Sequence, residues 1–231
     1  MTALNGPSYI IYNDISNTLG KIGLLYISIP LFFFWSVFAS TVNPEDLLAA
    51  ISGPIYTLII VFAVSGYKTL YPIAIGMGST RKRFLKSFYI TTLLYLLALM
   101  LVLNVLQMIL SMIFDWTNSS AIILHPGMLF HETFSFLPFY YLDAMASFFI
   151  FGFSFFLFAL YFTFGRVRFV VGAMLIALPL MGAYYLDMLT PLIDRISNAN
   201  LSGITVFSIL GITGIALKLL AYPLLRNVSP K

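Results

Sequence analysis

Cysteine is absent from this 231-residue chain, and charged residues make up only 9% of it. Without cysteine the chain forms no disulfide bond, offers no thiolate for catalysis and carries no lipid on a lipoprotein cysteine. Soluble domains contain roughly a quarter charged residues, so this composition argues against a soluble protein. The net charge of +4 does not indicate a nucleic-acid partner, because the lysine and arginine residues are distributed between the apolar segments as in a membrane protein.

The long apolar segments of the chain, which we call apolar blocks, also lack residues for catalysis or ion coupling. No charged residue lies near the middle of any block, although ion-coupled carriers usually bind the driving ion with a buried ionisable group. The two histidines, His125 and His131, fall in one gap, where we expect a solvated loop. His131-Glu132 lacks the second histidine of a zinc-protease motif, and Gly76-Met77-Gly78 lacks the spacing of a phosphate-binding loop. The sequence predicts no catalytic residue, no metal site and no cofactor bound by this chain.

Long apolar runs dominate what is present. Hydrophobic residues account for 61% of the chain, and the mean hydropathy is +0.99. A helix that crosses a bilayer needs roughly 20 apolar residues, and a helix satisfies its own backbone hydrogen bonds in lipid. The sequence predicts an all-α integral membrane protein with a single transmembrane domain over residues 1–231. Six segments qualify as spans, at about 21–40, 49–70, 86–114, 141–164, 167–186 and 202–222.

Three further expectations concern the last three spans. The tight turn at 165–168 predicts that spans four and five form an antiparallel hairpin. The phenylalanine-rich stripe at 148–158 is expected to face lipid rather than to form a binding site. In the sixth span, Ser208, Gly211 and Gly214 permit close packing with a neighbour, although they miss the G-x-x-x-G spacing of helix dimers.

The sign of the charge alternates from one gap to the next. Lysine and arginine follow the second, fourth and sixth spans, whereas acidic residues dominate the other gaps, with Arg195 and Asp14 as exceptions. In this pattern Asp143 belongs to an acidic gap and Lys218 to the basic C-terminal segment. Because short basic loops stay in the cytoplasm, the sequence predicts that both termini are cytoplasmic.

An amphipathic segment at residues 8–20 precedes the first span. Ile11, Ile15, Leu19 and Ile22 recur on one helical face, and polar residues lie elsewhere. This pattern predicts a helix that lies in the cytoplasmic interface of the membrane. The alternative is that the segment is simply the start of the first span.

Three polar residues share one face of the third span. Asn104, Gln107 and Ser111 are spaced at i, i+3 and i+7, and amide side chains within lipid seek partners. We expect them to pack against a neighbouring helix or a second subunit. The alternative is that they line a substrate path.

The strongest local signal is L-Y-P-I-A-I-G-M-G-S-T-R-K-R-F-L-K-S-F, at residues 70–88. Pro72 is expected to end the second span, and the glycines of Gly76-Met77-Gly78 allow a sharp change of direction. Ser79 or Thr80 can cap a new helix. By itself this segment is typical of a basic loop that sets topology and meets anionic lipid. Its basic residues are Arg81, Lys82, Arg83 and Lys86.

This segment resembles the cytoplasmic element between spans two and three in small permease subunits of ATP-binding-cassette (ABC) exporters of Gram-positive bacteria. The shared pattern, Y-P-x-x-x-x-x-G-x-[ST]-R-[KR]-x-F, is matched by Tyr71, Pro72, Gly78, Thr80, Arg81, Lys82 and Phe84. The resemblance implies a short coupling helix that docks on a separate ATPase subunit, which binds ATP and Mg²⁺. The residues implied in this coupling are Pro72, Gly76, Gly78, Ser79, Thr80, Arg81, Lys82, Arg83 and Phe84.

The resemblance also implies a multi-pass permease of the bacterial cytoplasmic membrane that switches between inward- and outward-facing states. Its partners are then the ATPase subunit, the lipid bilayer and a second permease copy or paralogue. The charge-free span interiors favour a hydrophobic or amphipathic cargo, such as a peptide or a lipid. The alternative is a non-transporting membrane anchor that recruits a partner through its basic loop.

Overall fold

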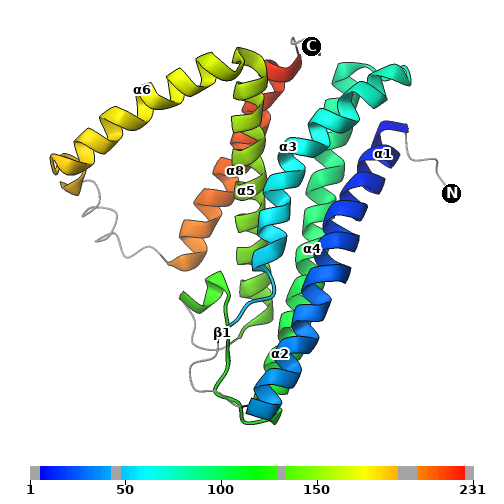
Figure 1. Cartoon of the computed structure of the whole chain (residues 1–231), viewed down its shortest axis with the longest axis vertical. Coiled ribbons are helices and arrows are strands. Elements are labelled where there is room, and N and C mark those ends of the chain that lie inside the picture. The colour runs from blue at the N-terminus through cyan, green and yellow to red at the C-terminus, as the bar shows by residue number, and fades with distance from the viewer. Residues whose placement is uncertain (1–5, 43–47, 130–133, 192–201, 227–231) are drawn as a thin grey trace.

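Six long apolar helices form the computed structural model, which describes residues 6–42, 48–129, 134–191 and 202–226 (Figure 1). All six are long and apolar enough to cross a membrane, which confirms the expected order of spans. The elements in chain order are α1 (Gly6–Ile15), η1 (Ser16–Ser28), α2 (Ile29–Val42), β1 (Leu48–Ala49), α3 (Gly53–Gly76), α4 (Arg81–Trp116), β2 (Ile122–Ile123), η2 (Pro126–Leu129), α5 (Phe136–Phe164), α6 (Arg166–Tyr185) and α8 (Gly203–Arg226).

The first span is one continuous helix, Gly6–Thr41, made of α1, the π-helical segment η1 and α2. The expected separate interfacial helix at 8–20 is therefore wrong, and its residues begin the first span. The apolar face packs against α3 and α4. Its fully buried side chains are Ile11, Ile15 and Leu19.

The π-helical segment changes which side of the first span is buried. Ile22, the fourth residue of the expected face, is 42% exposed. Gly23 and Ser28 are buried in its place. A π-helix has more residues per turn than an α-helix. Successive buried residues are therefore farther apart in the sequence than an α-helical pattern predicts.

The α3–α4 junction is a tight turn with no separate coupling helix. α3 continues through Pro72 to Gly76, and α4 begins at Arg81. The expectation that Pro72 ends the span is wrong. Tyr71 and Ala74 on either side of it are buried, and this packing offsets the backbone hydrogen bond that proline lacks.

The turn itself has the cap and the glycine that the sequence predicts. Gly78 has a φ of +82°, a left-handed conformation that favours glycine. The Arg83 backbone N–H donates a hydrogen bond to Thr80 Oγ1 at 3.3 Å. Thr80 therefore caps α4, and the direction of the chain reverses over four residues, 77–80.

An aromatic cluster fills the space between α3, α4 and α5. The ring centroid of Tyr67 in α3 lies 5.8 Å from those of Phe84 in α4 and Phe155 in α5. Phe88 lies 5.4 Å from Phe155. The expectation that the stripe at 148–158 faces lipid is wrong for its buried positions, since only its outer side, such as Phe153 at 44% exposed, is open.

Glycines bring α5 and α8 into backbone contact. A Cβ atom at Gly152 would overlap the Gly214 carbonyl oxygen, and one at Gly214 would overlap the Phe148 carbonyl oxygen. The neighbour that Ser208, Gly211 and Gly214 meet is thus α5 of the same chain. Small residues permit this close approach of two membrane helices.

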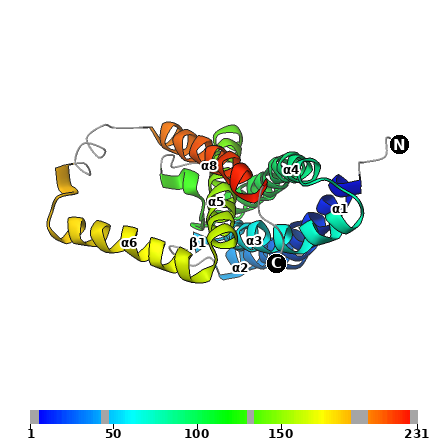
Figure 2. The ribbon, with the colours of Figure 1, turned by 90° about the horizontal axis from the view of Figure 1, so that it is seen from above.

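α6 departs from the bundle instead of forming a hairpin with α5 (Figures 1 and 2). The positive φ of Gly165, +80°, turns the chain away from α5. The two helices meet near this turn, where the ring centroids of Tyr161 and Phe169 lie 5.8 Å apart. None of the side chains in α6 is buried, so the expected antiparallel hairpin is wrong.

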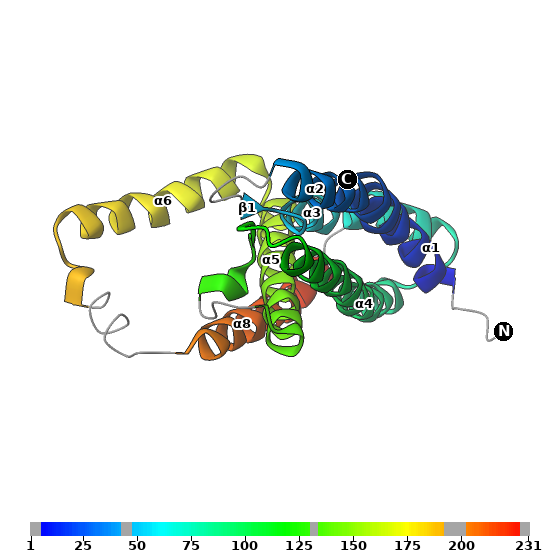
Figure 3. The same ribbon diagram turned by 90° about the horizontal axis from the view of Figure 1, so that it is seen from below.

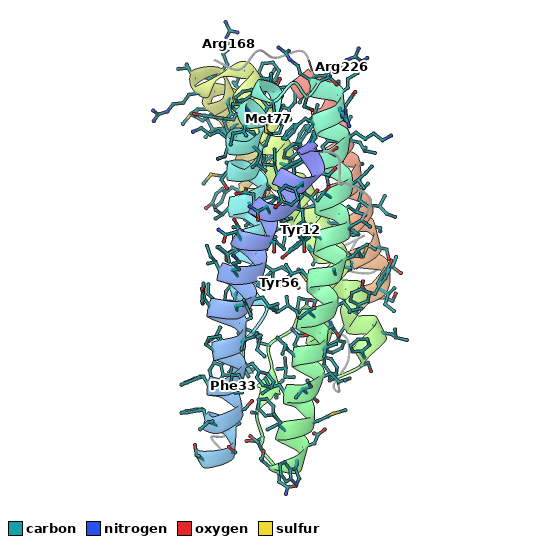
Figure 4. The ribbon with its side chains drawn as sticks, turned by 90° about the vertical axis from the view of Figure 1, so that its right-hand side faces the viewer. Tyr12, Phe33, Tyr56, Met77, Arg168 and Arg226 are labelled. Carbon is teal, nitrogen blue, oxygen red and sulfur yellow. The ribbon has the colours of Figure 1, made fainter. Side chains whose placement is uncertain are left out.

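The two ends of the molecule differ in chemistry. The α3–α4 turn at Met77 lies at the same end as Arg168 and Arg226 (Figure 4), and we call this the basic end. At the opposite end, which we call the loop end (Figure 3), β1 and β2 pair in parallel. Ser28 Oγ donates a hydrogen bond to the Ile51 carbonyl oxygen at 3.1 Å. The first span therefore helps to hold the strand pair in place.

Candidate functional site

A buried polar cluster forms where α3, α4, α5 and the β2–η2 loop meet. Its centre is Asp143 of α5, which is fully buried. The carboxylate accepts hydrogen bonds from the Tyr56 hydroxyl and, at 3.2 Å, from Asn104 Nδ2. His125 Nε2 lies 2.8 Å from Asp143 Oδ1. Figure 4 shows Tyr56 between the two ends of the bundle, so four distant segments of the chain converge on one carboxylate within it.

The His125 ring is held in one orientation. Its Nδ1 accepts a hydrogen bond from the Gly127 backbone N–H at 2.8 Å, and the ring stacks on Phe139 with centroids 4.4 Å apart. Because Nδ1 accepts this hydrogen bond, the ring presents its Nε2–H toward Asp143. That N–H lies beside Asp143 Oδ1 without the alignment of a hydrogen bond, so the contact is electrostatic.

The expectations for Asp143 and His125 are therefore wrong. Asp143 does not lie in a loop, because α5 begins at Phe136 and Asp143 lies about two turns inside this helix. His125 is 3% exposed and not solvated. The apolar residues at 136–142 are a sequence signal that could have placed Asp143 within the span. His131-Glu132 lies outside the described residues.

The polar face of α4 points into the protein. Asn104 and Gln107 are fully buried, and Ser111 is half-buried, so none of them faces lipid directly. Asn104 meets α5 through its hydrogen bond to Asp143. Both amide atoms of Gln107, and Oδ1 of Asn104, have no hydrogen-bond partner among the described residues. Buried polar atoms of this kind are usually satisfied by water.

A hollow of about 220 Å³ lies at the loop end of this polar face. Its lining includes Ser111 at the end of the polar face and, from the loop, Ser119 and Met128. Asp115 adds a carboxylate to the rim. Among the described residues, no group of three or more potential metal-ligating side chains is close enough to hold a metal ion.

A second charged side chain lies inside the helices. Lys218 of α8 is 7% exposed, and its Nζ donates hydrogen bonds to Thr92 Oγ1 at 2.8 Å and the Tyr89 carbonyl oxygen at 3.1 Å. The ammonium also lies 4.6 Å from the ring centroid of Phe151, a cation–π contact. No carboxylate pairs with it in the part of the chain that the structure describes. Lys218 is thus no part of a solvated C-terminal segment, since α8 continues to Arg226.

The residues implied in coupling lie at the basic end. Phe84 is fully buried and packs on Tyr71, so it belongs to the core and not to an exposed surface. A hollow of about 330 Å³ lies beside the turn, between Pro7, Met77 and Arg83. Of the other implied residues, Ser79 and Arg81 are half-buried, and the exposed ones are Pro72, Gly76, Gly78, Thr80, Lys82 and Arg83.

Comparison with known proteins identifies no family. No protein-family model, no curated protein and no solved structure matches the chain. What the structure establishes is an all-α chain with six candidate membrane spans. A finer assignment rests on the motif at 71–84 and on the geometry of the two ends.

Proposed function

We propose that this chain is the transmembrane permease subunit of an ABC exporter in a bacterial cytoplasmic membrane, with both termini cytoplasmic. The observation that carries the proposal is the α3–α4 turn, because the residues of the permease-like pattern, 71–84, form a capped turn at the basic end. A separate ATPase subunit, which binds ATP and Mg²⁺, docks on this turn. ATP-driven closure of the ATPase then switches the permease between inward- and outward-facing states.

Aromatic contacts connect this turn to the rest of the bundle. Tyr71 and Phe84, one on each side of the turn, have ring centroids 5.6 Å apart. Phe84 lies 5.9 Å from Phe88, which contacts Phe155 of α5. A closely packed interior transmits displacement, so force on the turn reaches α5. These contacts support coupling through the ends of α3 and α4 without a separate coupling helix.

The exposure of α6 supports a second permease copy or paralogue. This 20-residue apolar helix leaves the bundle and buries none of its side chains. Two permease subunits that face one another enclose a path, and α6 is a candidate span with no residue buried within this chain, which leaves it open to such a neighbour. Membrane helices associate through packing and polar contacts rather than through the hydrophobic effect.

The proposed cargo is hydrophobic or amphipathic, either a peptide or a lipid. An apolar hollow of about 280 Å³ lies between α3, α5 and the start of α6. Its lining includes Val64, Phe158 and Phe169 and contains no charged residue. Such a surface suits an acyl chain or an apolar peptide face better than a small hydrophilic solute, since Ser154 and Tyr161 are the polar side chains in its lining.

The alternative function is a non-transporting anchor that recruits a partner through the same basic turn. Both functions require the exposed side chains of Lys82 and Arg83. Only the permease requires that the partner hydrolyse ATP and that cargo stimulate this hydrolysis. ATP hydrolysis by the isolated complex therefore separates the two.

The test is purification of the chain from its native membrane in mild detergent, with ATP hydrolysis measured with and without amphipathic peptides or lipids. We expect a P-loop ATPase to accompany the chain and hydrolyse ATP faster with cargo. In the double variant Arg81→Ala/Lys82→Ala, stimulation by cargo should disappear while the chain still inserts. The matched control, Lys21→Ala/Lys68→Ala, removes two exposed positive charges elsewhere and should retain stimulation.

Two results would contradict the proposal. One is wild-type cargo-stimulated hydrolysis in a correctly inserted Arg81→Ala/Lys82→Ala complex. The other is a complex whose partner has no ATPase activity, which would favour the anchor. Because removal of cytoplasmic positive charge also weakens the orientation signal, insertion of both variants is checked by protease protection before activity is compared.

A further inference from the structure

We propose that the hollow at the loop end binds a primary ammonium group, with Asp115 as its counter-charge. This inference goes beyond the proposed function and does not depend on the ATPase partner. The hollow, of about 220 Å³, lies between the end of α4 and the loop that carries β2 and η2. Its lining combines the Asp115 carboxylate, the hydroxyls of Ser111 and Ser119, and apolar side chains such as Phe114 and Met128.

The carboxylate at this hollow has no cationic partner in the part of the chain that the structure describes. No lysine, arginine or histidine among those residues lies within ion-pair distance of Asp115. The sequence explains this, because it contains no lysine or arginine at 22–67 or at 87–165. These stretches hold β1, β2, η2, the end of α4 and the start of α5. A cation at the hollow therefore has to come from outside the chain.

The place of Asp115 in α4 adds to the negative potential. This residue lies in the last turn of a 36-residue helix that ends at Trp116, and no basic residue lies in that turn. The C-terminus of a helix carries a partial negative charge, so a carboxylate there is disfavoured and a cation is favoured. A cation bound in the hollow compensates both the carboxylate and the end of the helix.

Polar groups continue from the hollow along the same face of α4. Gln107 lies one turn inward from Ser111, is fully buried, and has two amide atoms without a partner among the described residues. One turn further, Asn104 meets Asp143, a second carboxylate without a lysine or arginine partner in the described part of the chain. The interior behind the hollow thus adds oxygen atoms and negative charge, and it does not offset the charge of Asp115.

The lining suits an ammonium better than a metal ion. Among the described residues, no three side chains of histidine, cysteine, aspartate or glutamate gather, and a calcium ion needs six to eight oxygen ligands. The three N–H groups of an ammonium need only three acceptors. The Asp115 carboxylate and the Ser111 and Ser119 hydroxyls supply them, since Ser119 Oγ accepts the Ala121 N–H with one of its two lone pairs. The Phe114 ring adds a surface for a cation–π contact.

Size and surroundings indicate the head group of a membrane lipid as the source of the ammonium. Sites for drug-sized ligands have volumes of about 300–1,000 Å³, so this hollow accommodates a head group and not a whole amphiphile. Met112 and Trp116, near Asp115 on α4, are 58% and 85% exposed and offer an apolar surface to the rest of such a molecule. Phosphatidylethanolamine carries a primary ammonium of this kind, and a soluble amine has the same chemistry.

The first test measures binding of butylammonium to the full chain in nanodiscs of phosphatidylcholine, a lipid without a primary ammonium. Saturation-transfer NMR of the probe gives its dissociation constant. We expect saturable binding, and none for butanol, a neutral probe of equal length. Asp115→Asn should weaken binding about tenfold or more, because a hydrogen bond to a charged group is lost. The matched control, Asp187→Asn, removes an exposed carboxylate just after α6 and should leave the affinity unchanged.

A second variant tests the position of the ligand without a change in charge. Ser111→Leu fills the hollow and should abolish binding, whereas Ser65→Leu, on an exposed position of α3, should retain it. Melting temperatures confirm that each variant is folded. Three results would overturn the site: no saturable binding of butylammonium, equal affinity in Asp115→Asn and the parent chain, or binding that survives Ser111→Leu.

The third test identifies the source of the ammonium. The same titration is repeated in nanodiscs that contain phosphatidylethanolamine. A head group that occupies the hollow competes with the probe, so the apparent dissociation constant of butylammonium should rise with the fraction of this lipid. An apparent affinity that does not depend on the lipid would refute the lipid source and assign the site to a soluble amine.

Discussion

Asp143 and Lys218 are two opposite charges buried in one bundle without contact between them. The carboxylate has three polar neighbours from three segments. The ammonium has two hydrogen-bond acceptors, both on α4, and an aromatic ring of α5. Each charge is thus held by neutral dipoles. Groups of this kind within membrane segments usually mark functional sites, because they are costly to retain.

Replacement of Lys218 by methionine should leave the folded protein as stable or more stable. Methionine keeps the length of the side chain, and Thr92 Oγ1 keeps its own hydrogen bond to the Phe88 carbonyl oxygen. Replacement of buried charged groups by apolar side chains of similar volume is often neutral or stabilising, by up to about 4 kcal/mol for a buried ion pair. Thermal unfolding in nanodiscs measures the change.

Lys68→Met is the matched control for this prediction. Lys68 is exposed on α3, and surface substitutions usually change stability by less than about 0.5 kcal/mol. A clear fall in melting temperature for Lys218→Met alone would contradict the prediction. It would show that the contacts of Lys218 with α4 outweigh the cost of its burial.

Single residues were predictable where their chemistry allowed one outcome. Asn104 and Gln107 lie mid-span and had to point inward, and Thr80 precedes a helix and caps it. Lys218 was not predictable, because a lysine two turns from a helix end can extend to the membrane surface. The choice depends on the space that α4 and α5 leave around it, which a single sequence does not show.

At the scale of elements, α5 and α8 form the closest pair. Their backbones touch at Gly152 and Gly214, and Tyr141 Oη and Ser208 Oγ lie 2.6 Å apart further along. Neither glycine can accept a side chain without displacement of a backbone. The pair therefore behaves as one unit, and relative motion is easier elsewhere, such as at the junction with α6.

Gly214→Ala should destabilise the protein by about 3 kcal/mol or more, at the upper end of what overpacking usually costs, because the added Cβ meets backbone atoms of Phe148 and Phe149. Gly172→Ala in α6 is the matched control, since a Cβ atom there meets nothing within 4 Å. The free energy of unfolding of this control should rise by up to about 1 kcal/mol, because alanine favours a helix more than glycine does. Thermal unfolding of both variants measures this difference in stability. Equal melting temperatures would disprove the close contact of α5 with α8.

Element order was predictable from the apolar runs, but the partners of each element were not. The face of Ile11, Ile15 and Leu19 was correctly identified as apolar. The same sequence pattern, however, is expected for a helix buried against α3 and α4 and for a helix buried in a membrane surface. The direction in which α6 leaves the bundle was likewise not predictable from the sequence. A tight turn favours a hairpin by connection length alone, and only the φ of Gly165 reveals the direction that the chain takes.

At the scale of the whole molecule, the basic end and the loop end should lie on opposite sides of the membrane. We expect Ser119→Cys to react with a membrane-impermeant thiol reagent in intact cells, and Ser79→Cys to react only after permeabilisation. The chain contains no other cysteine, so each signal is unambiguous. The reverse pattern would show that the charge distribution does not set the orientation as short basic loops usually do.

The length of α4 has a consequence for the membrane itself. Its 36 residues extend about 54 Å at 1.5 Å per residue, whereas the hydrocarbon core is about 30 Å thick. The first span has the same number of residues, and the two pack side by side. Charged residues at both ends of α4, among them Arg81, Lys86 and Asp115, keep those ends out of the hydrocarbon. Hydrophobic mismatch should therefore tilt the apolar stretch between them or thicken the surrounding bilayer.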